Sequence, residues 1–260
     1  MQYEITDSGL KDLKIKVLDM GQGQERAAWF LSGKGMSYET TFPTVMKRLF
    51  SATGIKPDSD LIKRFLPYAA YLNVDEVENI DVVWGNIAKK LKVDIGELRD
   101  LVLTRAALYS IAEHSRALLV AFTDGALPSN TGGGYNLRTI YRRALSFIER
   151  YGWKIDLIDI FKWHADYLKP LFPELKESLN EVQEILDIEK QKFKNSREKA
   201  RSIVINILKE RSSSLNENSL INLYDTYGIT PDLVKEEALK IGKKIDVPEN
   251  FYSRIAELHE

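Results

Sequence analysis

The sequence predicts a mostly α-helical chain with one small β element near its N-terminus. Apolar residues recur at intervals of three, four and seven over three long segments, and each segment is bounded by glycine or proline. A different pattern occupies residues 13–20, where LKIKVLDM alternates apolar side chains with lysines. That alternation is typical of a half-buried strand, so we expect one strand followed by helices.

The first elements are expected in the order strand, glycine turn, helix. The strand at residues 13–20 runs into GQGQER and then into the apolar run AAWFL. Further along, an apolar stripe predicts a long helix that should stop before Asp124 and Gly125. Its members are Leu101, Leu108, Ile111, Ala112, Leu118, Leu119 and Phe122.

Three more elements complete the expected helical part. A second stripe follows the triple glycine and consists of Leu137, Ile140, Tyr141, Ala144, Leu145 and Ile148. A third helix is expected to begin at Pro173 and to continue, with a bend, to Leu208. The polar residues 211–219 form the best linker candidate. In the last helix Thr230 is the expected N-cap, Pro231 the first residue and Gly242 the stop.

Composition narrows the function classes. The 260 residues contain 44% hydrophobic and 29% charged residues, enough for a folded core. Lys plus Arg (37) nearly balance Asp plus Glu (38), so a polyanion would have to be bound by a local basic patch. Cysteine is absent and histidine occurs three times, which excludes disulfides and a Cys/His zinc site. Short apolar runs and a polar start, MQYEITDSG, lead us to expect a cytoplasmic protein.

The stretch DGALPSNTGGGYNLRTIYRRAL, residues 124–145, has the composition of an anion-binding turn. Three glycines before a helix leave its first N–H groups accessible to a phosphate. Arg138 and Arg142, four residues apart, are expected to share an exposed face with Arg143 beside it, as a track along a nucleic-acid backbone. From composition alone, a plain turn with solvated arginines is the simpler interpretation.

Three segments resemble one family in its own order. Residues 124–145 resemble the segment that follows the class II catalytic core of alanyl-tRNA synthetases, written D-G-x-x-P-S-N-x-x-x-G-Y-x-L-R-x-x-x-R-R. LYDTYGITPDL at residues 223–233 resembles their L-Y-D-T-Y-G segment, and DMGQGQERAAWFLSG at residues 19–33 resembles their motif 3. The resemblance, to the archaeal type, spans residue 13 to about residue 245. It implies a helical tRNA-recognition domain with the motif 3 strand as its β element.

The resemblance implies two residues that read RNA bases. Asn130 and Asp225 match the family positions that read the G·U wobble pair in the acceptor stem of alanine tRNA. The chemistry fits, because the wobble leaves the guanine 2-amino group free in the minor groove and a carboxylate is a pure acceptor. Without the resemblance, both residues would be turn or cap residues. The expected tRNA contacts around them are Ser129, Arg138, Arg142, Arg143 and Tyr224.

The resemblance also implies half of an ATP site. Arg26 matches the motif 3 arginine, whose planar charged donors suit phosphate and adenine. Gly21 and Gly23 would allow close backbone approach to the nucleotide. ATP, with Mg²⁺, is therefore the expected cofactor of the complete enzyme, and no zinc is expected in this chain. Gly133 and Thr139 stand where many members have arginine, so the phosphate track is thinner than in bacterial members.

Three expectations about organisation follow from the resemblance. The domains are a catalytic remnant at 1–37, a helical tRNA-recognition subdomain at 38–210 and a C-terminal subdomain at 211–260 carrying LYDTYG. Because the sequence opens at motif 3, motifs 1 and 2 are expected in a catalytic portion on the same or a separate chain, and this chain alone is expected not to activate alanine. Asn130 and Asp225 are expected on opposite sides of one cleft. The alternatives are a stand-alone RNA-binding module and a helical interaction protein.

Overall fold

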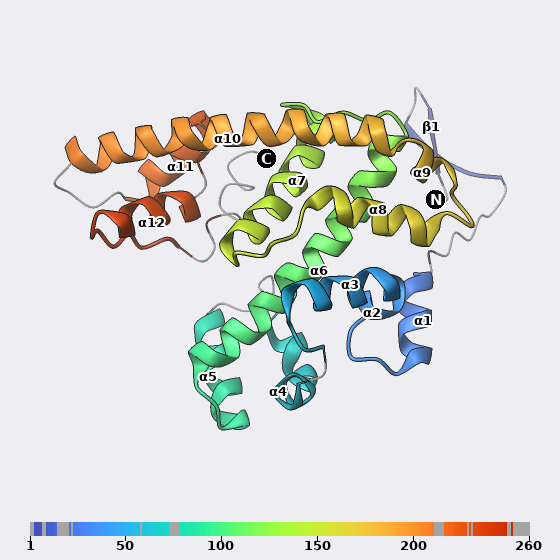
Figure 1. The fold of residues 1–260 in the computed structure, drawn as a ribbon, viewed down its shortest axis with the longest axis horizontal. Coiled ribbons are helices and arrows are strands. Elements are labelled where there is room, and N and C mark those ends of the chain that lie inside the picture. Colours follow the sequence, from blue (N-terminus) through green and yellow to red (C-terminus); the bar gives the residue numbers. More distant parts are fainter. Residues whose placement is uncertain are drawn as a thin grey trace. The chain divides into compact units, whose positions relative to one another are not determined.

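The structure is a computed structural model, and it is largely helical (Figure 1). It describes residues 3–6, 9–14, 21, 23–57, 59–72, 79–210, 216–227, 229, 231–248 and 251. Contacts divide the chain into two compact units, the first comprising Met1–Gly125 and Arg143–Leu179 and the second Ala126–Arg142 and Asn180–Glu260. The predicted fold class is confirmed, and the predicted domain limits at residues 37 and 210 stay predictions.

The β element is an antiparallel hairpin of β1 (Tyr3–Thr6) and β2 (Gly9–Asp12). Tyr3 pairs with Asp12 and Thr6 with Gly9, and the Thr6 hydroxyl donates to the Gly9 carbonyl at 2.8 Å. Gly9 has a φ of +110°, which favours glycine. The strand predicted at residues 13–20 is not seen at Leu13 and Lys14, and residues 15–20 lie outside the described part.

Unit 1 is built around the long helix α6 (Ile95–Thr123). The Asp94 carboxylate caps it by accepting from the Glu97 N–H at 3.0 Å. It ends at Thr123, directly before Asp124 and Gly125, as predicted. The other elements of this unit are α1 (Gln24–Ser32), α2 (Tyr38–Thr41), α3 (Pro43–Thr53), α4 (Asp60–Phe65), the 3₁₀ helix η1 (Leu66–Leu72), α5 (Ile80–Leu91), α8 (Leu157–Leu168) and α9 (Glu174–Glu177).

Two packing regions hold α6 in unit 1. In Figure 1 α5 lies beside the N-terminal half of α6. There the rings of Phe65 and Trp84 stack with their centres 6.1 Å apart, and Leu98 is fully buried. Helix α8 packs along the C-terminal half of α6. The Nε2 of its fully buried His164 lies 2.9 Å from the Ala112 carbonyl oxygen of α6. The apolar stripe predicted for α6 therefore faces protein on both halves.

Helix α5 ends in a strained conformation. Among the described non-glycine residues, Lys92 is the one with a positive φ, +57°, and it caps α5. We expect Lys92→Gly to raise the free energy of unfolding by about 0.5 kcal/mol, because glycine removes the left-handed penalty and gives back part of the gain through its unfolded-state entropy. Urea unfolding followed by tryptophan fluorescence measures this change in the free energy of unfolding, because Trp84 lies in α5. Lys89→Gly, inside the helix, should instead cost about 1 kcal/mol, and equal effects of the two would contradict the strain.

Unit 2 contains α10 (Leu179–Glu210), α11 (Glu217–Tyr227) and α12 (Pro231–Lys240). In Figure 1 α11 and α12 lie along the C-terminal half of α10. The buried cluster that joins them comprises Ala200, Val204, Leu220, Leu223, Ile229, Leu233, Val234, Ala238, Ile245 and Phe251. Helix α7 (Gly132–Arg150) begins in this unit, and the division between the units falls after Arg142.

The predicted helix ends are mostly confirmed in unit 2. Pro231 begins α12, and Gly242, with a φ of +73°, follows its end. Thr230, the expected cap, lies outside the described residues. The helix predicted from Pro173 is interrupted at Ser178, between α9 and α10. The predicted linker extends too far, because Asn216 caps α11 by accepting from the Ser219 N–H at 2.9 Å and residues 217–219 are helical.

Within the described ranges, no helix combines the length and the apolar character needed to span a bilayer.

Candidate functional site

The segment PSNTGGG folds into a loop that closes over the first turn of α7. The Ser129 N–H donates to the Gly134 carbonyl at 3.0 Å, and the Ser129 hydroxyl donates to the Thr131 carbonyl at 2.8 Å. A Cβ on Gly134 would lie 2.4 Å from the Ser129 Oγ and 2.6 Å from the Leu127 carbonyl oxygen. Gly134 is therefore needed for this closure, and the glycines belong to the helix instead of preceding it.

Asn130 is an exposed residue of this loop, and Arg138 of α7 holds its side chain. The Arg138 Nη1 donates to the Asn130 Oδ1. The same guanidinium donates from Nε to one oxygen of Glu189 at 2.8 Å and from Nη2 to the other at 3.3 Å. Arg138 thus joins the loop to α10, and its side chain is 13% exposed.

Glu189 receives a second arginine. The Arg142 Nη2 and Nε donate to its Oε1 at 3.0 and 3.2 Å, while the guanidinium carbon lies 5.7 Å from the Phe193 ring centre. Glu189 itself is only 2% exposed, so the arginines balance a buried carboxylate. Arg138 and Arg142 do share a face, but α10 covers part of it and leaves their side chains 13% and 28% exposed. Their contact with a phosphate stays a prediction.

Arg143 differs from these two arginines. It is exposed, in unit 1, and its guanidinium carbon lies 5.7 Å from the ring centre of Phe147 in the next turn of α7. The Phe147 ring is half-buried, but the exposed guanidinium stacked on it remains accessible to an anion. Of the three predicted track arginines, Arg143 has the charge most open to solvent.

The segment LYDTYG lies at the C-terminal end of α11. Asp225 belongs to the helix, but its side chain lies outside the described part. Tyr224 is half-buried against the unit 2 cluster and meets the Phe251 ring edge-on, with 5.9 Å between ring centres. Asn130 and Asp225 belong to the same compact unit. That they face one cleft stays a prediction.

A hollow of about 630 Å³ in unit 1 gathers the motif 3-like residues. Gly21, Gly23 and Arg26 line it, and Arg26 is exposed. A Cβ on Gly21 would meet no atom within 4 Å, so the space beside this backbone is open. The other residues around the hollow are Glu25, Trp29, Ser37, Tyr38, Thr41, Glu113 and Arg116.

Arg116 also lines this hollow, and the sequence patterns did not predict it. It pairs with Glu113 at 2.9 Å and with Glu25 at 3.6 Å. The pKa of Glu25 is lowered, first by a hydrogen bond from its own backbone N–H and then by the Arg116 charge. Among the described residues no carboxylate pairs with Arg26 in this way. The hollow therefore offers Arg26 as its uncompensated cation.

A family model described as class II tRNA synthetases (A) matches residues 1–260, the whole chain. The chain belongs to this family. It is 43% identical to an alanine–tRNA ligase of Methanocella arvoryzae over all of this chain and 29% of that protein. It is 34% identical to one of Caldivirga maquilingensis over all of this chain and 28% of that protein. It is 33% identical to an alanine–tRNA ligase of Nitrosopumilus maritimus over 95% of this chain and 27% of that protein.

The suspected resemblance to archaeal alanyl-tRNA synthetases is thereby confirmed. This class II synthetase chain spans less than a third of the length of the curated relatives it matches. The three quoted motifs lie at the hollow, at the loop and on α11.

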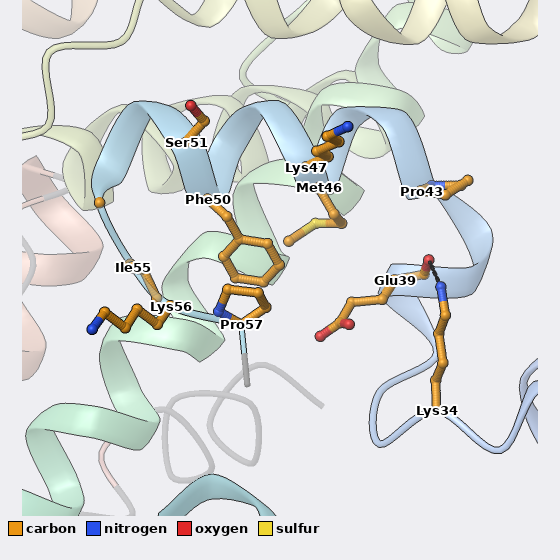
Figure 2. A pocket seen from close by; sticks show the side chains of 11 residues that line it. Lys34, Glu39, Pro43, Met46, Lys47, Phe50, Ser51, Ile55, Lys56 and Pro57 are labelled. Carbon is orange, nitrogen blue, oxygen red and sulfur yellow. Dashed lines mark hydrogen bonds between the residues drawn. The ribbon is translucent and has the colours of Figure 1, made fainter. Parts of the chain in front are cut away.

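This class II synthetase chain has a second hollow, of about 470 Å³, in unit 1 (Figure 2). Met46, Phe50, Ile55 and Pro57 supply apolar lining, and the other lining residues include three lysines. One of them, Lys34, donates from its ammonium group to the Glu39 backbone carbonyl at 3.1 Å. None of the predicted site residues lines this hollow.

Among the residues that the structure describes, no group of three or more His, Asp or Glu side chains converges to hold a metal ion.

Proposed function

We propose that this chain reads the acceptor stem of alanine tRNA as part of an alanine–tRNA ligase, with Asn130 and Asp225 contacting the G·U wobble pair. The observation that carries the proposal is the braced loop: Asn130 is exposed, and an ion-pair network centred on the buried Glu189 holds its side chain in place. A pre-organised polar side chain is what base reading requires, because ordering it on binding would cost affinity.

The electrostatics support an RNA partner. Arg138 and Arg142 share a single carboxylate, Glu189, so the network keeps one net positive charge beside the loop. Arg143 adds an exposed cation on the same helix. Phosphate contacts of this kind fix register, while Asn130 and Asp225 carry the base specificity. Ser129 and Tyr224 position the two readers.

The hollow in unit 1 fits a nucleotide. Arg26 offers permanently charged planar donors without a carboxylate partner among the described residues, and the backbone at Gly21 faces open space. In the complete enzyme ATP, with Mg²⁺, supplies the free energy for joining alanine to tRNA. In this chain, Arg26 would bind and orient the nucleotide, and Gly21 and Gly23 would leave room for it.

Binding of an acceptor-stem minihelix at two salt concentrations tests the proposal. We expect a G·U stem to bind about tenfold more tightly than a G·C stem, the value of one good base contact. Asp225→Asn and Asn130→Ala should each reduce this preference while the salt slope persists. Glu184→Gln removes one exposed charge from α10 and should leave the preference unchanged.

The alternatives predict other outcomes. Equal binding of both stems by the wild-type chain, unaffected by either substitution, would contradict base reading. Weak binding at both salt concentrations would favour a helical interaction protein. A preference for the G·U stem, with no ligation of alanine to tRNA even when the catalytic portion is added, would favour a stand-alone RNA-binding module.

A further inference from the structure

Glu189 is a buried acid that is not itself among the proposed RNA contacts. It lies on α10, 51 residues from Arg138, and is 2% exposed. A carboxylate in such a place keeps its charge only when cations and donors compensate it. Here both oxygens accept from Arg138 and one also accepts from Arg142. The acid therefore fixes where the Arg138 guanidinium lies.

The remaining nitrogen of the Arg138 guanidinium, Nη1, determines how Asn130 is oriented. With Nε and Nη2 engaged by Glu189, Nη1 donates to the Asn130 side chain. A guanidinium has only donors, so the amide atom that faces it must be the oxygen. The amide nitrogen, with its two N–H donors, is left for a ligand. The amide cannot flip without losing the Arg138 bond.

We propose that Glu189 is a positioning residue for RNA recognition, acting through Arg138 to present the Asn130 amide nitrogen as a hydrogen-bond donor. This rests on the function proposed above. The presented edge recognises an acceptor in the minor groove, such as a pyrimidine O2 or a purine N3. Glu189 itself touches no RNA. Without its charge, Arg138 loses its two charge-assisted bonds to Glu189 and keeps a long one, of 3.5 Å, to the Pro128 carbonyl. Asn130 then becomes free to rotate.

Unit 2 provides a matched control for a purely structural role. Glu237 on α12 is another buried carboxylate, 4% exposed, and accepts from Arg201 and Lys240 at 2.8 Å each. None of these contacts involves the loop. Glu237→Gln removes the same kind of buried charge from the same unit. A general loss of stability in unit 2 should therefore affect both substitutions alike.

The first experiment needs no RNA. In ¹⁵N NMR spectra of the full chain, the Asn130 side-chain NH₂ signal is assigned by its loss in Asn130→Asp. We expect an ordered amide in the wild type and in Glu237→Gln, and a mobile one in Glu189→Gln. Arg138→Lys, which keeps the charge but cannot bridge both partners, should also free the amide. An amide that stays equally ordered in both Glu189→Gln and Arg138→Lys overturns the inference.

The second experiment measures the G·U over G·C preference of the same variants. Glu189→Gln should lower it about fivefold, the value of one neutral hydrogen bond, Glu189→Asp should restore part of it, and Glu237→Gln should keep it. A full preference in Glu189→Gln overturns the inference. If the wild type shows no preference while its amide is ordered and freed by Glu189→Gln, the proposed function fails and the positioning stands.

Discussion

Gly134→Ala is expected to lower the free energy of unfolding by about 3 kcal/mol, the upper end for overpacking. The new methyl group would lie 2.6 Å from the Leu127 carbonyl oxygen, a backbone atom that cannot rotate away. The Ser129 hydroxyl, 2.4 Å from it, is itself held by the Thr131 carbonyl. The loop must therefore open, and Asn130 should lose its place beside Arg138.

Gly133→Ala is the matched control for this prediction. A Cβ there meets no atom within 4 Å, and the residue lies in the first turn of α7. Alanine should therefore raise stability, by up to about 1 kcal/mol. Urea unfolding followed by far-UV circular dichroism reads both variants, because the four tryptophans all lie in unit 1 and fluorescence does not report unit 2. Equal effects of the two substitutions would show that the loop does not close on Gly134.

Acidification from pH 7.5 to pH 5 is expected to lower the free energy of unfolding of unit 1 by about 2 kcal/mol through His164. Burial, helped by the nearby Arg116 charge and opposed by the Ala112 hydrogen bond, lowers the pKa of His164 from 6.5 to about 4. The folded state thus binds fewer protons than the unfolded state between these values. This stabilisation is present above pH 6.5 and is lost as the pH falls toward 4.

His164→Gln tests this assignment, because glutamine can still donate to the Ala112 carbonyl but does not titrate. Tryptophan fluorescence during urea unfolding should show a smaller loss of stability on acidification than in the wild type. His114 contributes in the same direction, since burial and Arg143 lower its pKa to about 4. When His114→Gln is added to His164→Gln, the free energy of unfolding should change little from pH 7.5 to pH 5. An undiminished slope would place the proton uptake elsewhere.

Local patterns predicted much of the helical framework. The ends of α6 and α12 were read from Asp124, Pro231 and Gly242, because helix stops depend on residues within one turn. The predicted linker was too long, because its serines and asparagines resemble loop residues and Asn216 is a cap. Short helices such as α2 and α4 carried too few residues to show a period.

The candidate site was predictable residue by residue and not as an arrangement. The motifs identified Asn130, Asp225 and Arg26. They gave no sign of Glu189 or Arg116, which lie on other helices and belong to no quoted motif. A buried acid within a mixed-charge helix resembles its solvated neighbours until its partners are known.

The sequence alone determined the helical class, the glycine-rich turn and the family, because each depends on residue identities within short segments. The tertiary structure decided which charges are buried. Helical spacing shows that Arg138 and Arg142 share a face, but only the packing of α10 places Glu189 against that face. A buried charge is defined by what surrounds it, and that environment comes from residues about fifty positions away in the chain.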